Sequence, residues 1–199
     1  MKRNFLMQIK IISINLLFFL FCHSCKDFNS NDEIIDYGIV INEINYNSSD
    51  NFDPDDWIEI YNSSNELINI GFWMLKDEND DNVAVIPEST LIAPNQYIIF
   101  CKDSLKFSQK FPNVIFHATQ LNFGLSGSKD AVRIFDSNGT LADIVEYKDD
   151  PPWPGEADGE GATLELKHPS LDNSYGYNWA PSSLNGTPGN INSSFIEIP

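Results

Sequence analysis

Two stretches of alternating side chains, joined by an acidic turn, constrain the fold of this chain more than any other feature. They are residues 39–44 and residues 57–61. Both are rich in β-branched and aromatic residues, which favour strands. The residues between them are mainly Asn, Ser, Asp and Pro, which favour turns. The pattern predicts two paired strands that begin an all-β domain.

Alternation along these stretches also predicts which side chains enter the core. Successive side chains of a strand point to opposite faces, so Ile41 and Glu43 should share one face and Ile44 should take the other. On the second strand, Ile58 and Ile60 should share a face. The residues expected to face the core are Ile39, Ile41, Ile58 and Ile60.

Short strand patterns continue along the rest of the chain, separated by residues that favour turns. The candidate strands are residues 67–70, 72–75, 83–86, 90–92, 96–101, 113–116, 131–135, 140–147 and 163–166. Only residues 103–111 have the composition of a short helix. Many short strands divided in this way indicate a β-sandwich or a barrel.

The N-terminus has the pattern of an export signal. Lys2 and Arg3 form a basic start, and residues 11–21 form an apolar run of the length found in signal peptides. A membrane-spanning helix needs about 20 apolar residues, which is more than this run provides. We therefore expect residues 1–24 to be a cleaved signal peptide rather than a membrane span.

The end of this signal contains two cysteines in different contexts. Cys25 follows the small residue Ser24, and this pair resembles the lipobox of bacterial lipoproteins, in which the cysteine receives the lipid. Cys22 follows the bulky Phe21 and fits that pattern poorly. The resemblance implies a cell-envelope lipoprotein, held at the outer membrane by lipid on Cys25. The acidic residues 25–37 are expected to form a flexible tether, similar to segments that direct some Gram-negative lipoproteins to the cell surface.

Charge and length limit what the rest of the chain can do. Loss of the signal would change the net charge from −17 to −20, because it carries three basic residues and no acidic one. A strongly acidic surface repels phosphate backbones, so we expect no nucleic-acid partner.

We expect one domain over residues 38–192 and a short tail over residues 193–199. Cys101 would have no cysteine partner in that domain, so we expect it to pack in the core.

Short motifs spread over the chain form an ordered set. In the first half they are residues 41–44 (INEI), 56–62 (DWIEIYN) and 71–75 (GFWML). In the second half they are residues 93–94, 125–126, 130–132, 136–139, 143–147, 153–154, 178–179 and 187–189. Together they cover residues 38–192 and resemble the lamin tail domain family, in its bacterial form.

The resemblance implies an immunoglobulin-like β-sandwich. It also implies an adhesive or targeting role, because bacterial domains of this kind are similar to such modules of secreted and surface proteins, often attached to hydrolases. No hydrolase accompanies the domain in this sequence. Asn95 stands where the family has Gly after Ala-Pro, and Asn tolerates the same turn conformation. We expect a binding, adhesion or scaffold module whose ligand is a protein or a glycan.

Trp153 and Trp179 are the candidate binding residues. Residues 149–155 include three prolines, which remove backbone donors, so this segment must be a loop or an edge. The two tryptophans either pack over one end of the sandwich or form an exposed aromatic surface for a sugar or a peptide. Packing is the simpler interpretation, because tryptophan is usually highly buried.

Two acidic clusters are candidate calcium sites, and calcium is the one cofactor that the sequence suggests. Residues 77–88 nearly match the calcium-loop pattern, with Asn82 in place of its Gly. The candidate ligands in this cluster are Asp77, Asn79, Asp81 and Glu88. The second cluster consists of Asp50, Asp53, Asp55 and Asp56, and Asp53 and Asp55 are its candidate ligands. Strand patterns rather than helices flank the first cluster, so a solvated turn is the simpler interpretation of each.

No catalytic motif is visible in the sequence. His117 and His168 lie outside any recognisable motif, and Ser126 lacks the second glycine of a nucleophile elbow. Glu43 and Glu59 could face each other as a carboxylate pair for glycoside hydrolysis, or they could accept hydrogen bonds within the sheet. We expect a protein that is not an enzyme, with a secreted hydrolase and a calcium-binding module as the alternatives.

Overall fold

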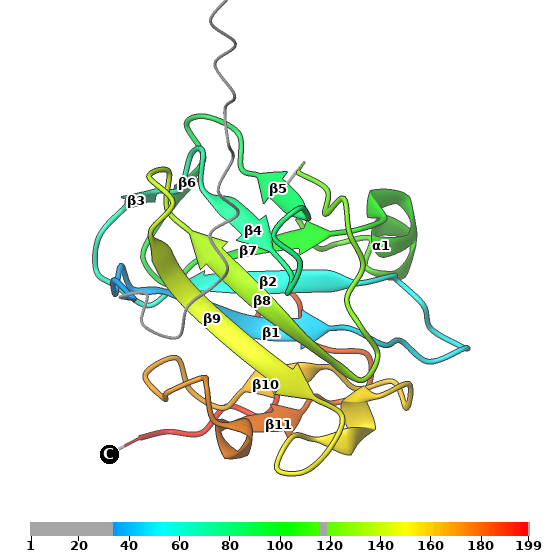
Figure 1. Ribbon diagram of the computed structural model, residues 1–199. Helices are drawn as coiled ribbons and strands as arrows, with labels where there is room; N and C mark the ends of the chain where they lie inside the picture. Colours follow the sequence, from blue (N-terminus) through cyan, green and yellow to red (C-terminus); the bar gives the residue numbers. More distant parts are fainter. Residues whose placement is uncertain (1–33, 116–118, 199) are drawn as a thin grey trace, which may run out of the picture.

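The computed structural model describes residues 34–115 and 119–198, which form two main β-sheets packed face to face (Figure 1) and a small third sheet of two strands, β3 (Ile68–Asn69) and β6 (Leu91–Ile92). The larger sheet contains β1 (Ile39–Asn45), β2 (Trp57–Asn62), β7 (Tyr97–Cys101), β10 (Leu164–Leu166) and β11 (Trp179–Pro181), in the order β11-β10-β1-β2-β7. The smaller sheet contains β4 (Met74–Lys76), β5 (Val83–Val85), β8 (Lys129–Phe135) and β9 (Leu141–Lys148), in the order β5-β4-β8-β9. Neighbouring strands are antiparallel in both sheets. The predicted all-β immunoglobulin-like sandwich is confirmed.

The remaining elements connect or cover the two sheets. They are β3 (Ile68–Asn69), β6 (Leu91–Ile92), the helix α1 (Ser104–Lys110) and the short 3-10 helices η1 (Gly155–Ala157) and η2 (Gly176–Asn178). Residues 113–115 join no sheet, so the strand predicted from residue 113 is wrong there. The strand β11 was not predicted, because its Trp-Ala-Pro sequence is too short to show alternation.

The four isoleucines expected in the core lie between the two sheets. Each is at most 3% exposed. Val132 and Ile134 of β8 and Val145 of β9 belong to the same buried cluster. This part of the prediction is confirmed, and it fixes which faces of β1 and β2 point outward.

A β-bulge in β1 corrects the predicted positions of two side chains. The register shifts between Ile41 and Glu43, so Glu43 lies opposite Glu59 and Ile44 lies opposite Ile58. A bulge adds one residue to a strand and reverses the alternation beyond it. Ile44 therefore joins the core, and the prediction that Glu43 shares the face of Ile41 is wrong.

Helix α1 covers the outer face of the larger sheet. The side chain of Asp103 accepts hydrogen bonds from the N–H groups of Leu105 and Lys106, at 3.0 Å each, which is the geometry of an N-cap. Phe107 of this helix is buried in a second apolar cluster together with Trp57 of β2. The short helix expected in this region is confirmed.

Cys101, at the end of β7, packs in the same second cluster as a buried free thiol. Burial raises its pKa to about 11, so the thiol is protonated at neutral pH and is a poor nucleophile. The packing role expected for Cys101 is confirmed.

The residues expected to attach the protein to a membrane precede the part of the chain that the structure describes. The signal peptide over residues 1–24 and the lipidation site Cys25 lie outside the described residues. Among the residues that are described, no helix is both long enough and apolar enough to cross a membrane.

Candidate functional site

Three glutamates lie next to one another on the outer face of the larger sheet. Glu43 of β1 lies opposite Glu59 of β2 on one side and opposite Glu165 of β10 on the other. All three are 0% exposed. The last part of the chain, residues 182–194, which we call the C-terminal segment, supplies many of their hydrogen bonds. The two glutamates that the sequence paired are therefore brought together, with a third beside them.

Backbone N–H groups attach the C-terminal segment to these carboxylates. The N–H of Thr187 donates to Glu43 Oε1 at 3.0 Å. The N–H of Gly189 donates to Glu59 Oε2 at 2.6 Å. The N–H of Ser194 donates to the third carboxylate at 2.7 Å. These three hydrogen bonds hold the C-terminal segment on the sheet.

The buried position of these glutamates changes their acidity. Burial raises the pKa of Glu59 to about 8, although hydrogen bonds from Gly189 and Asn42 oppose the rise. Burial, and then the charges of Glu59 and Glu165, raise the pKa of Glu43 well above its ordinary value. Within the described part of the chain, Glu43 Oε2 has no hydrogen-bond partner. Glu43 and Glu59 are closed off from solvent, so a glycoside has no room to reach them. They accept hydrogen bonds within the sheet instead.

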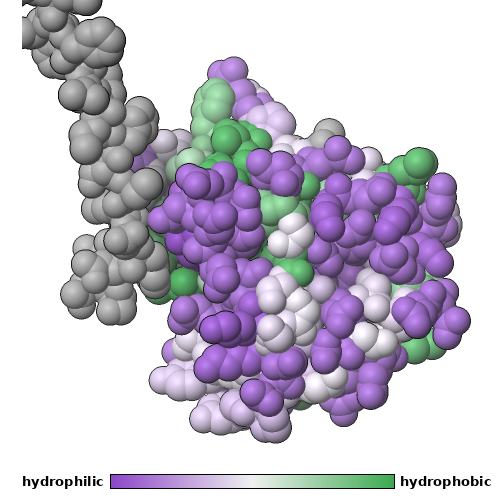
Figure 2. All heavy atoms as spheres, turned by 45° about the vertical axis from the view of Figure 1, so that its right-hand side comes forward, coloured by the Kyte–Doolittle hydropathy of each residue, from purple (hydrophilic) through white to green (hydrophobic). Residues whose placement is uncertain are grey.

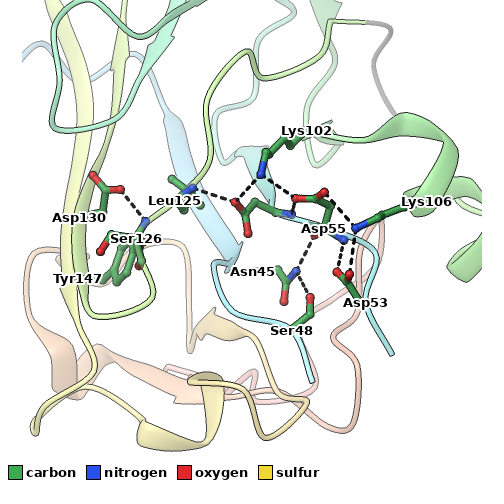
Figure 3. A network of polar contacts seen from close by, with 11 residues as sticks. Asn45, Ser48, Asp53, Asp55, Lys102, Lys106, Leu125, Ser126, Asp130 and Tyr147 are labelled. Carbon is green, nitrogen blue, oxygen red and sulfur yellow. Dashed lines mark hydrogen bonds and ion pairs between the residues drawn. The ribbon is translucent and has the colours of Figure 1, made fainter. Parts of the chain in front are cut away.

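The loop between β1 and β2 holds the carboxylates of the second acidic cluster, and two lysines bind them (Figure 3). Lys106 Nζ of α1 lies 2.9 Å from Asp53 Oδ2 and 3.3 Å from Asp55 Oδ2. Lys102 Nζ lies 3.2 Å from Asp55 Oδ1. Asn45 Nδ2 donates to the backbone oxygen of Asp55 at 2.9 Å and fixes the end of the loop. The two ammonium groups supply positive charge where the sequence suggested a calcium ion.

These contacts, together with burial, lower the pKa values of two aspartates of the loop and raise the pKa of a third. The hydrogen bond from Lys106 lowers the pKa of Asp53. Burial pushes the pKa of Asp55 upward, but hydrogen bonds from the Asp56 N–H and from Lys102 leave it below its ordinary value. Burial raises the pKa of Asp56 to about 6. Asp53 and Asp55 are therefore ionised at neutral pH, and most Asp56 side chains are ionised as well.

The same loop lines two adjoining hollows, which share residues 47–50 and which we call the loop-end groove. The larger hollow, about 750 Å³, also touches residues 159–160 and 184–185. The smaller hollow, about 310 Å³, is lined by Asp53, Asp55, Asp56 and Lys106 as well. The groove is thus concave, polar and rich in carboxylates. Hydrophilic side chains also cover most of the face shown in Figure 2.

The cluster that resembles a calcium loop folds as a turn closed by its own groups. Asp77 is 5% exposed, and its Oδ1 accepts a hydrogen bond from the N–H of Asn79 at 2.8 Å. Arg133 Nε donates to the backbone oxygen of Asp77 at 2.8 Å. Asp81 and Glu88 are exposed. The structure therefore brings Asp77 and Asn79 together and leaves the other two candidates at the surface.

The calcium sites stay predictions, and a simple measurement tests them. No group of three or more His, Cys, Asp or Glu side chains in residues 34–115 and 119–198 is arranged to hold a metal ion. We expect a chelator to leave the melting temperature unchanged, whereas loss of a ligand present at 100 times its dissociation constant would cost about 2.7 kcal/mol. A rise of several degrees on adding calcium, abolished by Asp77→Ala or by Asp55→Ala, would contradict this expectation and identify the loop.

Trp153 and Trp179 lie against each other at one end of the sandwich. Their ring centroids are 5.9 Å apart, and the side chains are 7% and 2% exposed. Trp179 Nε1 donates to the backbone oxygen of Asn173 at 2.8 Å. This geometry agrees with the interpretation that the two tryptophans pack within the domain, and not with an exposed aromatic binding surface. The aromatic side chains exposed nearby are Tyr175 and Tyr177, which the sequence pattern did not single out.

Sequence reasoning missed three residues that shape these sites. Glu165 interrupts a strand of otherwise apolar and neutral residues, and that interruption was a usable signal. Lys102 precedes helix α1 and Lys106 lies in its first turn, but nothing local indicates that they meet a loop some 50 positions earlier in the chain. The acidic clusters were visible in the sequence, whereas their basic partners were not.

Comparison with known proteins identifies most of this fold. The family model described as the Lamin Tail Domain matches residues 37–149. That range includes β1 to β9, and the structure adds β10, β11 and the C-terminal segment to the same sandwich. A search of curated proteins found no match.

Proposed function

The chain belongs to the lamin tail domain family, and from that premise we propose that it is a non-catalytic binding module held at a bacterial cell envelope by a lipid on Cys25. The family consists of non-enzymatic immunoglobulin-like domains. The loop-end groove is the surface through which the module binds a partner protein, as an adhesion or scaffold element. The basic start, the short apolar run and the Ser24-Cys25 pair support the lipid anchor.

The observation that carries the binding role is the chemistry of the loop-end groove. Asp50 and Glu160 are exposed carboxylates of its larger hollow, and Asp53 and Asp55 line the smaller one. Lys102 and Lys106 form ion pairs with the carboxylates of the smaller hollow, and within the described residues Asp50 and Glu160 have no ion pair. The ligand that fits is a basic segment of a partner protein, whose cationic side chains pair with the free carboxylates. The acidic charge of the whole chain adds long-range attraction for such a segment.

Binding of a lysine-rich peptide, followed by calorimetry, tests this role. The double variant Asp50→Asn with Glu160→Gln should bind about tenfold more weakly, because each exposed ion pair contributes up to about 1 kcal/mol. The matched control is Glu88→Gln with Glu146→Gln, which removes the same charge from exposed positions outside the groove. Equal losses in both double variants would mean that the peptide senses only net charge, and the groove would then have no role.

The anchor is tested separately, by feeding cells a labelled fatty acid. The parent protein should incorporate the label, because multiple acyl chains on one cysteine anchor a protein stably at about 0.8 kcal/mol per buried CH₂. Cys25→Ala should lose both the label and the membrane fraction, and the control Cys22→Ala should keep both. A Cys25→Ala protein that still pelleted with membranes and retained residues 1–24 would favour an uncleaved helical anchor.

A further inference from the structure

Another hollow lies beside β7 and shares no lining residue with the loop-end groove. Its volume is about 590 Å³, and we call it the amide groove. Its amide side chains are Asn95, Gln96, Asn113 and Asn190. The rest of the lining is Tyr97, Gly189, Pro188 and aliphatic residues, so every residue that lines it is uncharged. In a chain with a net charge of −17, such a surface is chemically distinct.

We propose that the amide groove binds an uncharged oligosaccharide. A sugar hydroxyl both donates and accepts hydrogen bonds, and an amide side chain offers one group of each kind. An ionic ligand would find no charged partner in this lining and would lose solvation on entry. The proposal concerns a different surface from the loop-end groove, so it stands or fails independently of the binding of basic peptides.

The amide side chains keep hydrogen-bonding groups free for a ligand. Asn95 Oδ1 accepts from the hydroxyl of Tyr61 at 2.9 Å, which leaves its NH₂ group to donate. Asn190 Nδ2 donates to the backbone oxygen of Pro188 at 3.2 Å, which leaves its oxygen to accept. Gln96 and Asn113 are exposed at the rim. The groove therefore presents donors and acceptors on more than one side.

Part of the lining offers the apolar contacts that the C–H face of a sugar needs. Ile115 is 92% exposed, and Val114 and Tyr97 are half-buried, next to the buried Ile99 and Pro188. The rings of Tyr61 and Tyr97 lie with their centroids 4.8 Å apart and support each other. Binding sites for small molecules commonly combine an apolar lining with a few well-placed polar groups.

Hydrogen bonds to the rest of the domain hold the groove in shape before a ligand arrives. The N–H of Gly189 donates to the buried carboxylate of Glu59 at 2.6 Å, which fixes the wall formed by the C-terminal segment. On the opposite wall, the N–H of Asn95 donates to the backbone oxygen of Asn62 at 2.9 Å. A preformed site loses less conformational entropy when it binds a ligand.

An extended peptide is the competing occupant, and the geometry disfavours it. Such a peptide would bind by adding a strand to the edge strand β7. Ile99 on that edge is 1% exposed, and the backbone oxygen of Cys101 already accepts from the N–H of Leu121 at 3.1 Å. The Cys101 end of β7 is therefore already paired, and a peptide along the rest of the strand is the competing outcome that the experiment separates.

Calorimetry with the full chain in detergent micelles tests the proposal, using N-acetylated chito-, cello- and manno-oligosaccharides as probes. At least one should bind, and the double variant Asn113→Ala with Asn190→Ala should lose about tenfold in affinity, as expected for two hydrogen bonds. The exposed control Asn65→Ala should bind like the parent. Binding should also be insensitive to salt, since no charge lines the groove.

The contrary outcomes are equally specific. The proposal is overturned if none of the three saccharide families binds, if the double variant binds as tightly as the parent, or if acidic oligogalacturonate binds better than the neutral probes. Binding of a neutral peptide that the double variant loses, without binding of any saccharide, would also overturn it. Should the double variant unfold, Asn113→Ala alone gives the same test, because Asn113 is exposed at the rim.

Discussion

Replacing Ile60 with alanine should lower the free energy of unfolding by about 2 to 5 kcal/mol, the range for emptying a buried aliphatic site. Ile60 is 0% exposed and lies between Ile41 of β1 and Ile98 of β7 in the larger sheet. Its side chain belongs to the cluster between the two sheets, so the cavity cannot be filled by solvent without wetting that core. Chemical denaturation, analysed as a two-state transition, measures the change.

The control for this variant is Ile115→Ala, which removes the same atoms from a side chain that is 92% exposed. Its free energy of unfolding should stay within about 0.5 kcal/mol of the parent value, as for most surface substitutions. If Ile60→Ala unfolded at the same denaturant concentration as the parent, the inward face of β2 would be assigned incorrectly. The opposite face, with Trp57, would then have to supply the core.

Raising the pH from 6 to about 8 should lower the stability of the domain, because Glu59 has an ordinary pKa of 4.5 and a folded pKa of about 8. Over this range the unfolded chain has released the proton and the folded chain still holds it. Stability then falls by about 1.4 kcal/mol per pH unit for each retained proton. Burial raises the pKa values of Asp56 and Asp143 only to about 6, so these groups contribute mainly below the window.

The variant Glu43→Gln tests whether the buried glutamates, rather than other titrating groups, cause this fall in stability. Its remaining oxygen can still accept from the N–H of Thr187, and its amide takes the place of Oε2, which has no partner in the described residues. Since burial raises the pKa of Glu43 well above its ordinary value, the variant should make the fall in stability with pH less steep. Glu146→Gln, at an exposed position of β9, should leave the slope unchanged. An unchanged slope in Glu43→Gln would mean that Glu43 is ionised in the folded protein.

The sequence predicted those parts of the fold that depend on local pattern. Ile58 and Ile60 alternate within a regular strand, so their inward position follows from the period of two. Glu43 and Ile44 follow a bulge, which has no signature in the residues themselves and which reverses the pattern beyond it. Strand existence was therefore predictable, whereas register past the irregular point was not.

The sites were less predictable, because their partners come from distant parts of the chain. The acidic residues of the first loop stand together in the sequence, and this led to a calcium hypothesis. Lys106 meets Asp53 only because α1 folds back over the outer face of the sheet. In the same way, Gly189 reaches Glu59 across 130 positions, and only the folded chain places the C-terminal segment over the glutamates.

The most direct test of the binding role is a titration of the isotope-labelled chain with the lysine-rich peptide, in which NMR amide shifts report the residues that the peptide touches. We expect the largest shift changes in residues 47–53, with further changes in residues 159–160 and 184–185. The amide groove should remain unchanged in this titration. Shift changes spread evenly over exposed acidic residues such as Glu88 and Glu146, without a maximum at the loop-end groove, would contradict the proposal.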